Sequence, residues 1–289
     1  MNRSISRLSQ TSRLRAFVLA AALVVAPSAA FAQTFVRIDV PGAKNTDARG
    51  INQNGQIVGV FDNGTEGSHG FLLSGGLFTR IDVPGAASTF AAGINHGGQI
   101  VGGFTEAGGD FHGFLLDQGA FTVIDFPGAV STAAGGINDR GQIVGTFLDA
   151  AGTFRGFLFD AGVFTEIAVP GAALVQVLGI NDRSQIVGFF ADASNTAQGF
   201  LWDSGIVTPI AVQSGGGTFA AGINRRGQIV GAFGEASGKA HGYLLSSGAF
   251  ILLDAPGATD TQAFGINQGG EIVGFSIDAA GLHHGFLAR

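Results

Sequence analysis

The side chains in this sequence that could do chemistry are histidines and aspartates separated by a fixed number of residues. In each pair the aspartate comes 13 positions after the histidine. An aspartate beside a histidine can orient the imidazole ring as a general base. The pairs are His69 with Asp82, His112 with Asp125, and His241 with Asp254. At the two intervening positions, Arg155 and Gln198 replace the histidine, and alanine replaces the aspartate in both cases.

We interpret these pairs as structural rather than catalytic, because several copies spread along one chain cannot all serve one active site. Each aspartate is followed seven residues later by a threonine, which predicts a His–Asp–Thr hydrogen-bond cluster. These threonines are Thr46, Thr89, Thr132 and Thr261, and they follow Asp39, Asp82, Asp125 and Asp254. His284 has no aspartate after it, so its predicted partner is Asp39, near the other end of the chain. Arg155 and Gln198 are not metal ligands, so we expect no metal and no cofactor.

The elements that position these residues belong to a repeat. The stretch GINxxGQIVG, with small variations, begins at Gly50 and returns every 43 residues up to Gly265. A fixed period of this length indicates a repeat architecture, and about four strand signals in each unit are typical of a propeller blade. In the first unit we expect strands at residues 48–52, 56–61, 69–73 and 78–83. No segment after residue 32 shows helical periodicity.

The two ends of the repeated region are complementary. It begins with a lone fourth strand, residues 35–40, and ends after a third strand, residues 284–287. The sequence therefore predicts an all-β fold, a six-bladed β-propeller with four-stranded blades, closed by the N-terminal strand pairing with the last blade. A β-solenoid is the alternative, and it would not need complementary ends.

The first 32 residues have the composition of a signal peptide. Four arginines precede the apolar run Ala16–Val25, and Ala30-Phe31-Ala32 supplies a cleavage site. We expect a secreted or periplasmic protein whose residues 33–289 form a single domain. The chain has 15 basic and 21 acidic side chains, and loss of the leader arginines leaves 11 basic ones and a net charge of −10. This charge argues against nucleic acid as a partner. The chain has no cysteine, and we expect a monomer without membrane insertion.

A family resemblance supports this location. The tripeptide His-Gly-Phe begins at His69, His112 and His284, its variant His-Gly-Tyr begins at His241, and GINxxGQIVG or a close variant precedes it each time. The repeat resembles that of secreted bacterial HAF repeat proteins, named for the tripeptide His-Ala-Phe, although glycine stands here in place of alanine. The resemblance covers residues 35–287. It implies an extracellular or cell-envelope repeat protein, and it carries over no catalytic residues.

Candidate binding residues are found where the units differ. The first unit alone places charged residues near its inner strand, namely Lys44, Asp47 and Arg49. The fourth unit has an unusually apolar segment with Leu174, Val175, Val177 and Leu178, and its third strand contains Trp202. We expect these apolar residues to repack a seam between blades that lacks the polar cluster. The alternative is an exposed apolar patch that binds a partner.

The expected function is therefore that of a secreted, non-catalytic binding scaffold for an envelope protein or a glycan. Loops on a rigid framework carry most binding functions, so the contacts should lie on one face of the ring. The alternative is an extracellular hydrolase or lyase that acts on a polysaccharide at the mouth of the central channel. Such an enzyme needs several ionisable side chains that converge there. A purely structural envelope component is a third possibility.

Overall fold

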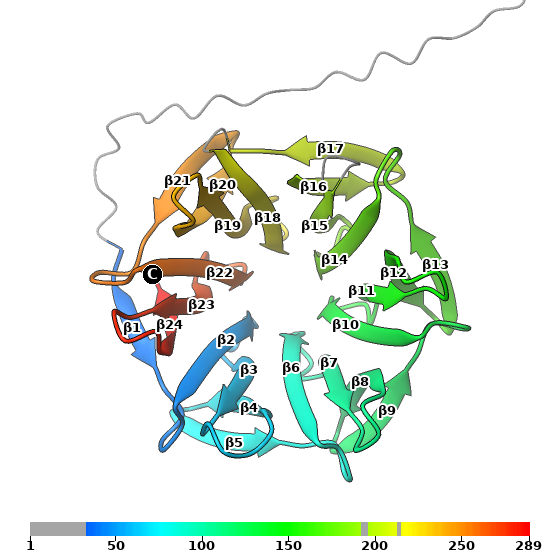
Figure 1. Ribbon diagram of the computed structural model, residues 1–289, viewed down its shortest axis with the longest axis horizontal. Helices are drawn as coiled ribbons and strands as arrows, with labels where there is room; N and C mark the ends of the chain where they lie inside the picture. The colour runs from blue at the N-terminus through cyan, green and yellow to red at the C-terminus, as the bar shows by residue number, and fades with distance from the viewer. Residues whose placement is uncertain (1–32, 192–195, 213–214) are drawn as a thin grey trace, which may run out of the picture.

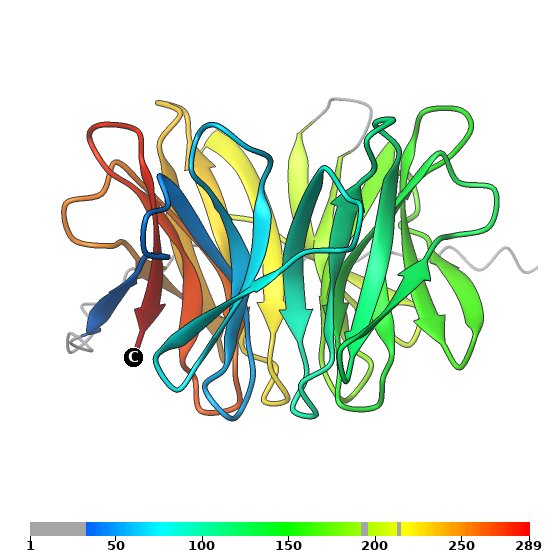
Figure 2. The same ribbon diagram turned by 90° about the horizontal axis from the view of Figure 1, so that it is seen from below.

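The computed structural model describes residues 33–191, 196–212 and 215–289, so the expected signal peptide lies outside the described residues. These residues form six four-stranded antiparallel sheets arranged as blades around a central axis (Figure 1). The protein is thus a six-bladed β-propeller, as the sequence predicted. Figure 2 shows the ring from the side, with loops on both faces. No helix in the described part of the chain is long and apolar enough to cross a membrane.

The strands of each blade follow one another outward from the axis. Blade 1 contains β2 (Asn45–Ile51), β3 (Ile57–Asp62), β4 (His69–Ser74) and β5 (Leu77–Ile81). Blade 2 contains β6 (Ser88–Ile94), β7 (Ile100–Thr105), β8 (Phe111–Asp117) and β9 (Ala120–Ile124). Blade 3 contains β10 (Ser131–Ile137), β11 (Ile143–Leu148), β12 (Phe154–Asp160) and β13 (Val163–Ile167). Blade 4 contains β14 (Leu174–Ile180), β15 (Ile186–Ala191), β16 (Ala197–Asp203) and β17 (Ile206–Ile210). Blade 5 contains β18 (Gly215–Ile223), β19 (Ile229–Glu235), β20 (Ala240–Ser246) and β21 (Ala249–Leu253).

Blade 6 is built from both ends of the described chain. It contains β22 (Asp260–Ile266), β23 (Ile272–Ile277) and β24 (His283–Ala288), and β1 (Phe35–Ile38) is its outer strand. Phe35 pairs with Ala288 and Ile38 with Gly285. Beyond this ladder, Thr34 and Arg289 exchange two backbone hydrogen bonds of 3.1 and 3.2 Å. The predicted closure of the ring by the N-terminal strand is confirmed.

The inner strands begin earlier than the sequence predicted. In blade 1 the connecting turn ends when the backbone N–H of Ala43 donates to Val40, and Lys44 then already bonds Asp62 of β3. Because strand pairing follows directly on this turn, β2 begins at Asn45 and not at residue 48. In blade 4 the same register places the apolar segment that starts at Leu174 inside β14.

The glycine that opens each GINxxGQIVG stretch lies where neighbouring inner strands touch. A Cβ atom on any of the six would lie 3.1–3.3 Å from the Cα atom of the next glycine in the ring. Such a distance is too short for most side chains, so glycine is required for this close approach of two backbones. The six glycines are Gly50, Gly93, Gly136, Gly179, Gly222 and Gly265, and the last lies against the first.

The asparagine two residues later links the blades by hydrogen bonds. Its side-chain Nδ2 donates to the backbone oxygen of the equivalent asparagine in the next blade, over 3.0–3.3 Å. Its Oδ1 accepts the backbone N–H four residues later, which closes its own turn. The six bonds form a closed ring through Asn52, Asn95, Asn138, Asn181, Asn224 and Asn267, all of them buried.

The hydrophobic core lies in the seams between blades. Val58 of blade 1 is fully buried together with Ile94 and Phe114 of blade 2, and the other seams repeat this packing. The two-residue hairpin loops between the third and fourth strands of blades 1 to 5 have primed geometry. Gln118 and Gly119, for example, have φ angles of 49° and 85°, and two successive positive values are typical of a type I′ turn.

Candidate functional site

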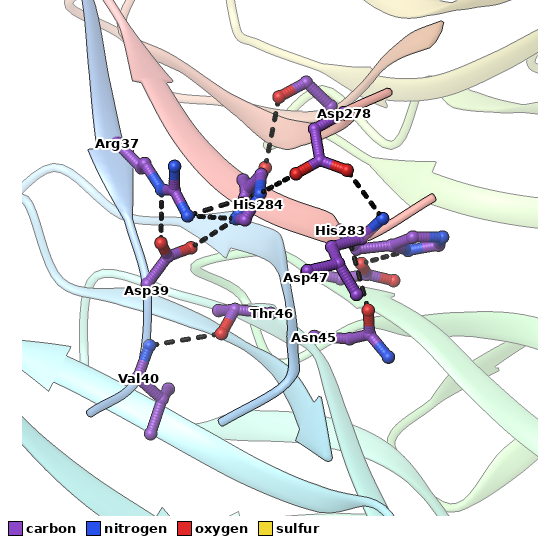
Figure 3. Close-up of polar contacts among 11 residues, drawn as sticks. Arg37, Asp39, Val40, Asn45, Thr46, Asp47, Asp278, His283 and His284 are labelled. Carbon is purple, nitrogen blue, oxygen red and sulfur yellow. Dashed lines mark hydrogen bonds and ion pairs between the residues drawn. The ribbon is translucent and has the colours of Figure 1, made fainter. Parts of the chain in front are cut away.

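Each repeated histidine contacts the aspartate predicted for it. Nδ1 lies 3.0 Å from Asp82 at His69, 2.7 Å from Asp125 at His112, and 2.8 Å from Asp254 at His241. In blade 6, His284 lies 3.3 Å from Asp39 of the closing strand (Figure 3). Two-residue loops fix the register of the third and fourth strands, which is why the sequence could predict these pairs.

A second carboxylate faces the other ring nitrogen of each of these histidines. Nε2 lies 3.1–3.9 Å from Glu66, Glu106, Glu235 or Asp278, all in the loop that precedes the third strand or at its edge. Arg155 occupies the same place in blade 3, and it bonds both Asp149 and Glu166. Since an arginine cannot act as a general base at neutral pH, its presence here supports the interpretation that these groups brace each blade.

The predicted role of the threonines needs correction. The Oγ1 of Thr46 accepts the backbone N–H of Val40 and does not bond the Asp39 carboxylate (Figure 3). Thr89, Thr132 and Thr261 make the same bond to the residue after each aspartate. Thr218 makes it as well, although Ala211 replaces the aspartate in that blade. The threonine therefore anchors the turn between blades, independently of the His–Asp pair.

A cavity of about 640 Å³ lies on the axis of the ring. Every inner strand has a β-bulge just before the glycine that recurs in each repeat, and the extra residue lines this cavity. A bulge re-aims one side chain without ending the strand. In ring order the bulge residues are Arg49, Ala92, Gly135, Leu178, Ala221 and Phe264. Arg49 and Phe264 are neighbours across the seam between blades 1 and 6. Strand β14, which contains Leu178, lies across the axis from β2 (Figure 1).

Side chains outside the bulges complete the wall of the cavity. Aromatic rings and small polar groups come from blades 1 to 4, namely Ser68, Ser88, Phe90, Phe111, Ser131, Thr146, Phe154 and Gln176. The turns that follow the inner strands contribute Gln53, His96, Asp139, Asp182 and Gln268 at the other end. Aromatic faces beside hydroxyl and amide groups are the usual composition of a small-molecule site, and the volume lies in the usual range.

A charged cluster joins blades 1 and 6 beside the cavity. Asp47 is buried, and its two oxygens bond Arg49 Nη2 at 2.8 Å and His283 Nδ1 at 2.9 Å. The Arg49 guanidinium carbon lies 4.2 Å from the centre of the Phe264 ring, and His283 stacks on Phe275 at 4.5 Å. Figure 3 shows His283 of β24 reaching across to Asp47 of β2. This seam is thus the place where ionisable groups converge near the axis.

Of the three charged candidates in the first unit, Lys44 lies apart from the other two. It precedes β2, it is exposed, and its side chain lies near Gly64 in the loop between β3 and β4. Sequence reasoning did not identify His283 or Phe264. His283 comes just before His-Gly-Phe, and Phe264 comes just before GINxxGQIVG. Both positions vary among the repeats although the motifs beside them do not, and this variation could have identified them.

The apolar candidates of the fourth unit do not form an exposed patch. Val175 and Val177 are buried in the seam between blades 3 and 4, as expected, with Trp202 packed against the same cluster. Leu174 is half-buried, and Leu178 lines the cavity as a bulge residue. Val175 stands where the other blades have their turn-anchoring threonine, and a valine cannot accept that hydrogen bond. Only Leu178 therefore remains a direct candidate for contact with a ligand in the cavity.

The described residues offer no ready metal site. No group of three or more His, Asp or Glu side chains in this part of the chain is arranged to hold a metal ion. The carboxylates beside Arg155 and His284 are instead tuned by hydrogen bonds. The pKa of Asp149 is lowered, first by the hydrogen bond from Arg155 and then by the backbone of Thr153. The pKa of Asp278 is also lowered, first by the backbone N–H of Leu282 and then by His284.

Comparison with known proteins places the chain by its fold. No protein-family model matches it, and no curated protein matches its sequence. AofleA from Arthrobotrys oligospora has a similar structure, with 11% identity, coverage of 89% of this chain and 86% of that one, and a TM-score of 0.58. The fungal lectin of Aleuria aurantia, described as a six-bladed β-propeller with a novel mode of fucose recognition, has 12% sequence identity to this chain and a TM-score of 0.53. The match covers 85% of this chain and 93% of the lectin. TolB from Acinetobacter baumannii has 12% identity and a TM-score of 0.57, and the match covers 81% of this chain and 63% of TolB.

Proposed function

We propose that the protein is a secreted or periplasmic binding scaffold that takes a glycan in its central cavity. The observation that carries the proposal is that the recurring and the variable positions of the repeat have different places in the structure. Positions that recur in all blades form the glycine and asparagine rings, whereas the bulge positions, which vary, line the cavity. A scaffold residue must satisfy the same packing in every blade, and a ligand that is not sixfold symmetric needs a different residue in each.

The chemistry of the cavity favours a glycan over a peptide. Phe90 and Phe154 can cover the C–H face of a sugar ring, and Ser88 and Gln176 can bond its hydroxyl groups. The similarity to fucose-binding propellers agrees with such a ligand, although at these identities it shows the fold alone. The expected signal peptide and the resemblance to HAF repeat proteins support a location outside the cytoplasm, where glycans are abundant.

The proposal is tested with a variant that fills the cavity. Phe264 shows that the scaffold accepts a phenyl ring at a bulge position, so Ala92→Phe should fold and should occupy ligand space. We expect residues 33–289 to bind members of a glycan array, and Ala92→Phe to lose this binding. The matched control is Ala120→Phe, on the exposed outer strand of blade 2, which should bind as before. A ligand that Ala92→Phe retains would bind elsewhere, and a folded protein that binds no glycan would contradict the proposal.

The enzyme alternative also has one observation in its favour, because Asp47, Arg49 and His283 converge beside the cavity. A histidine oriented by a buried carboxylate is a candidate general base for a hydrolase or lyase. A turnover screen on extracellular polysaccharides tests it. Product formation that Asp47→Asn abolishes would establish that the protein is an enzyme. If every polymer that binds yields no product, the protein acts as a binding scaffold.

A further inference from the structure

The central cavity contains a single fixed positive charge. Among its lining residues, Arg49 is the only lysine or arginine. The two lining aspartates already accept hydrogen bonds at the far end, Asp139 from the backbone of His96 and Asp182 from the backbone of Asp139. Arg49 is therefore the one cation of the wall, and its ion-pair partner among the described residues is Asp47.

The position of Arg49 is fixed by its neighbours, and most of its hydrogen-bond donors are unused. Its guanidinium lies over the Phe264 ring at 4.2 Å, and one nitrogen donates to Asp47. No other described residue accepts a hydrogen bond from it, although a guanidinium has five N–H donors. Asp47 in turn shares its carboxylate with His283, which holds the acceptor in place behind Arg49. The result is a preorganised fork that lines the cavity with free donors.

A guanidinium fork on an aromatic face recognises a planar anion with apolar surface beside it. A carboxylate fits better than a phosphate dianion, because the wall has one cation and Asp47 already pairs with it, which leaves N–H donors rather than a second charge for the ligand. The rest of the wall is uncharged near this fork, with Leu178 opposite and Ala92 and Ala221 leaving space on either side. Such a wall suits a ring with hydroxyl groups and one carboxylate.

We infer that the glycan bound in the central cavity is acidic, a uronate-containing oligosaccharide whose carboxylate pairs with Arg49 above Phe264. This inference rests on the proposed function and makes its ligand specific. Arg49 is the residue that distinguishes the acidic sugar from its neutral counterpart. Asp47 and His283 are positioning residues that hold the guanidinium in place.

The experiment compares tetragalacturonate with the galactose tetramer of the same linkage by calorimetric titration. We expect the neutral tetramer to bind roughly 10- to 100-fold more weakly, the loss expected for a hydrogen bond to a charged group. Arg49→Gln should reduce the affinity for tetragalacturonate to that for the neutral tetramer. Arg49→Lys, which keeps the charge but not the fork, should fall between the two. The control Arg80→Gln changes an exposed arginine on an outer strand and should bind as the parent protein does.

The outcomes separate this inference from the proposed function. Equal affinities for the two tetramers, both lost in Ala92→Phe, would overturn the acidic-ligand inference and leave the glycan-binding cavity intact. Binding of neither tetramer nor any other glycan would overturn both. Thermal unfolding of each variant shows whether it is folded, and Arg49→Lys gives a second reading if Arg49→Gln is destabilised.

Discussion

At the scale of single residues, Gly136 shows how little space the ring leaves at its narrowest level. A Cβ atom there would lie 3.1 Å from the backbone oxygen of Leu178 and 3.2 Å from the Cα of Gly179. Neither atom can move without shifting a strand of the next blade. By contrast, a Cβ atom on Gly97 would meet only the Asn95 side chain, at 3.4 Å, and its φ lies outside the left-handed region. The same residue type is thus indispensable in one place and replaceable in another.

Gly136→Ala should therefore lower the free energy of unfolding by about 1–3 kcal/mol, the usual cost of overpacking. The matched control Gly97→Ala should change it by less than about 0.5 kcal/mol, as expected of an exposed turn. Urea unfolding followed by fluorescence or circular dichroism measures both. Equal unfolding midpoints for the two variants would contradict the close packing of the glycine ring.

At the scale of strands and loops, Arg155 ties the loop after β11 to the outer strand β13. It bonds Asp149 in the loop and Glu166 on the strand. In four other blades a histidine likewise lies between a carboxylate of the loop and a carboxylate at the outer strand. Because Arg155 holds the pKa of Asp149 below its ordinary value of 3.8, the ionised carboxylate contributes to stability above that pH. The contribution is lost as the pH falls below 3.8 and the native carboxylate takes up a proton.

Asp149→Asn should therefore lower the unfolding temperature at pH 7, and this difference from the parent protein should shrink in acid. Asparagine can still accept the backbone N–H groups of Ala151 and Thr153, so the turn itself is preserved. Asp110→Asn is the control, since Asp110 lies in the corresponding loop of blade 2 and its carboxylate has no hydrogen bond to a described residue. Thermal scans across the acidic range provide the measurement. A difference that is equally large at low and neutral pH would contradict the assigned role of the charge.

The sequence could predict contacts within a blade but not contacts between blades. Contacts within a blade were predictable, because a two-residue loop fixes which residues of two strands face each other, as at His69 and Asp82. Contacts between blades were not, because no loop fixes the register across a seam. The bond from Asn52 to the next blade, and the reach of His283 to Asp47, depend on how two sheets pack. The burial of Val175 in a seam was predicted, whereas the early start of its strand was not, since a turn decides where that strand begins.

At the scale of the whole molecule, the ring depends on the four residues of β1. Without this strand, β24 becomes the edge of blade 6, and the ring of Phe286 loses its contact with Phe35 at 5.2 Å. His284 also loses its bond to Asp39 if that residue leaves its place. An unpaired edge of this kind invites pairing with another chain.

A chain that starts at Asp39 should therefore unfold at lower urea concentration and with a lower m-value than one that starts at Gln33. A lower m-value means that less surface becomes buried on folding or that the transition is no longer two-state. Size-exclusion chromatography should show association through the freed edge. Cooperative unfolding at the parent midpoint, with no change in size, would mean that the ring does not need its closing strand.

The hydrogen bonds between Thr34 and Arg289 have one more consequence. Because its two described ends are in contact, the fold is a closed ring of six 43-residue repeats. A circular permutant whose new termini lie in a hairpin of another blade should therefore form the same ring. The order of the blades around the axis therefore determines the fold, and the position of the chain termini within that order does not.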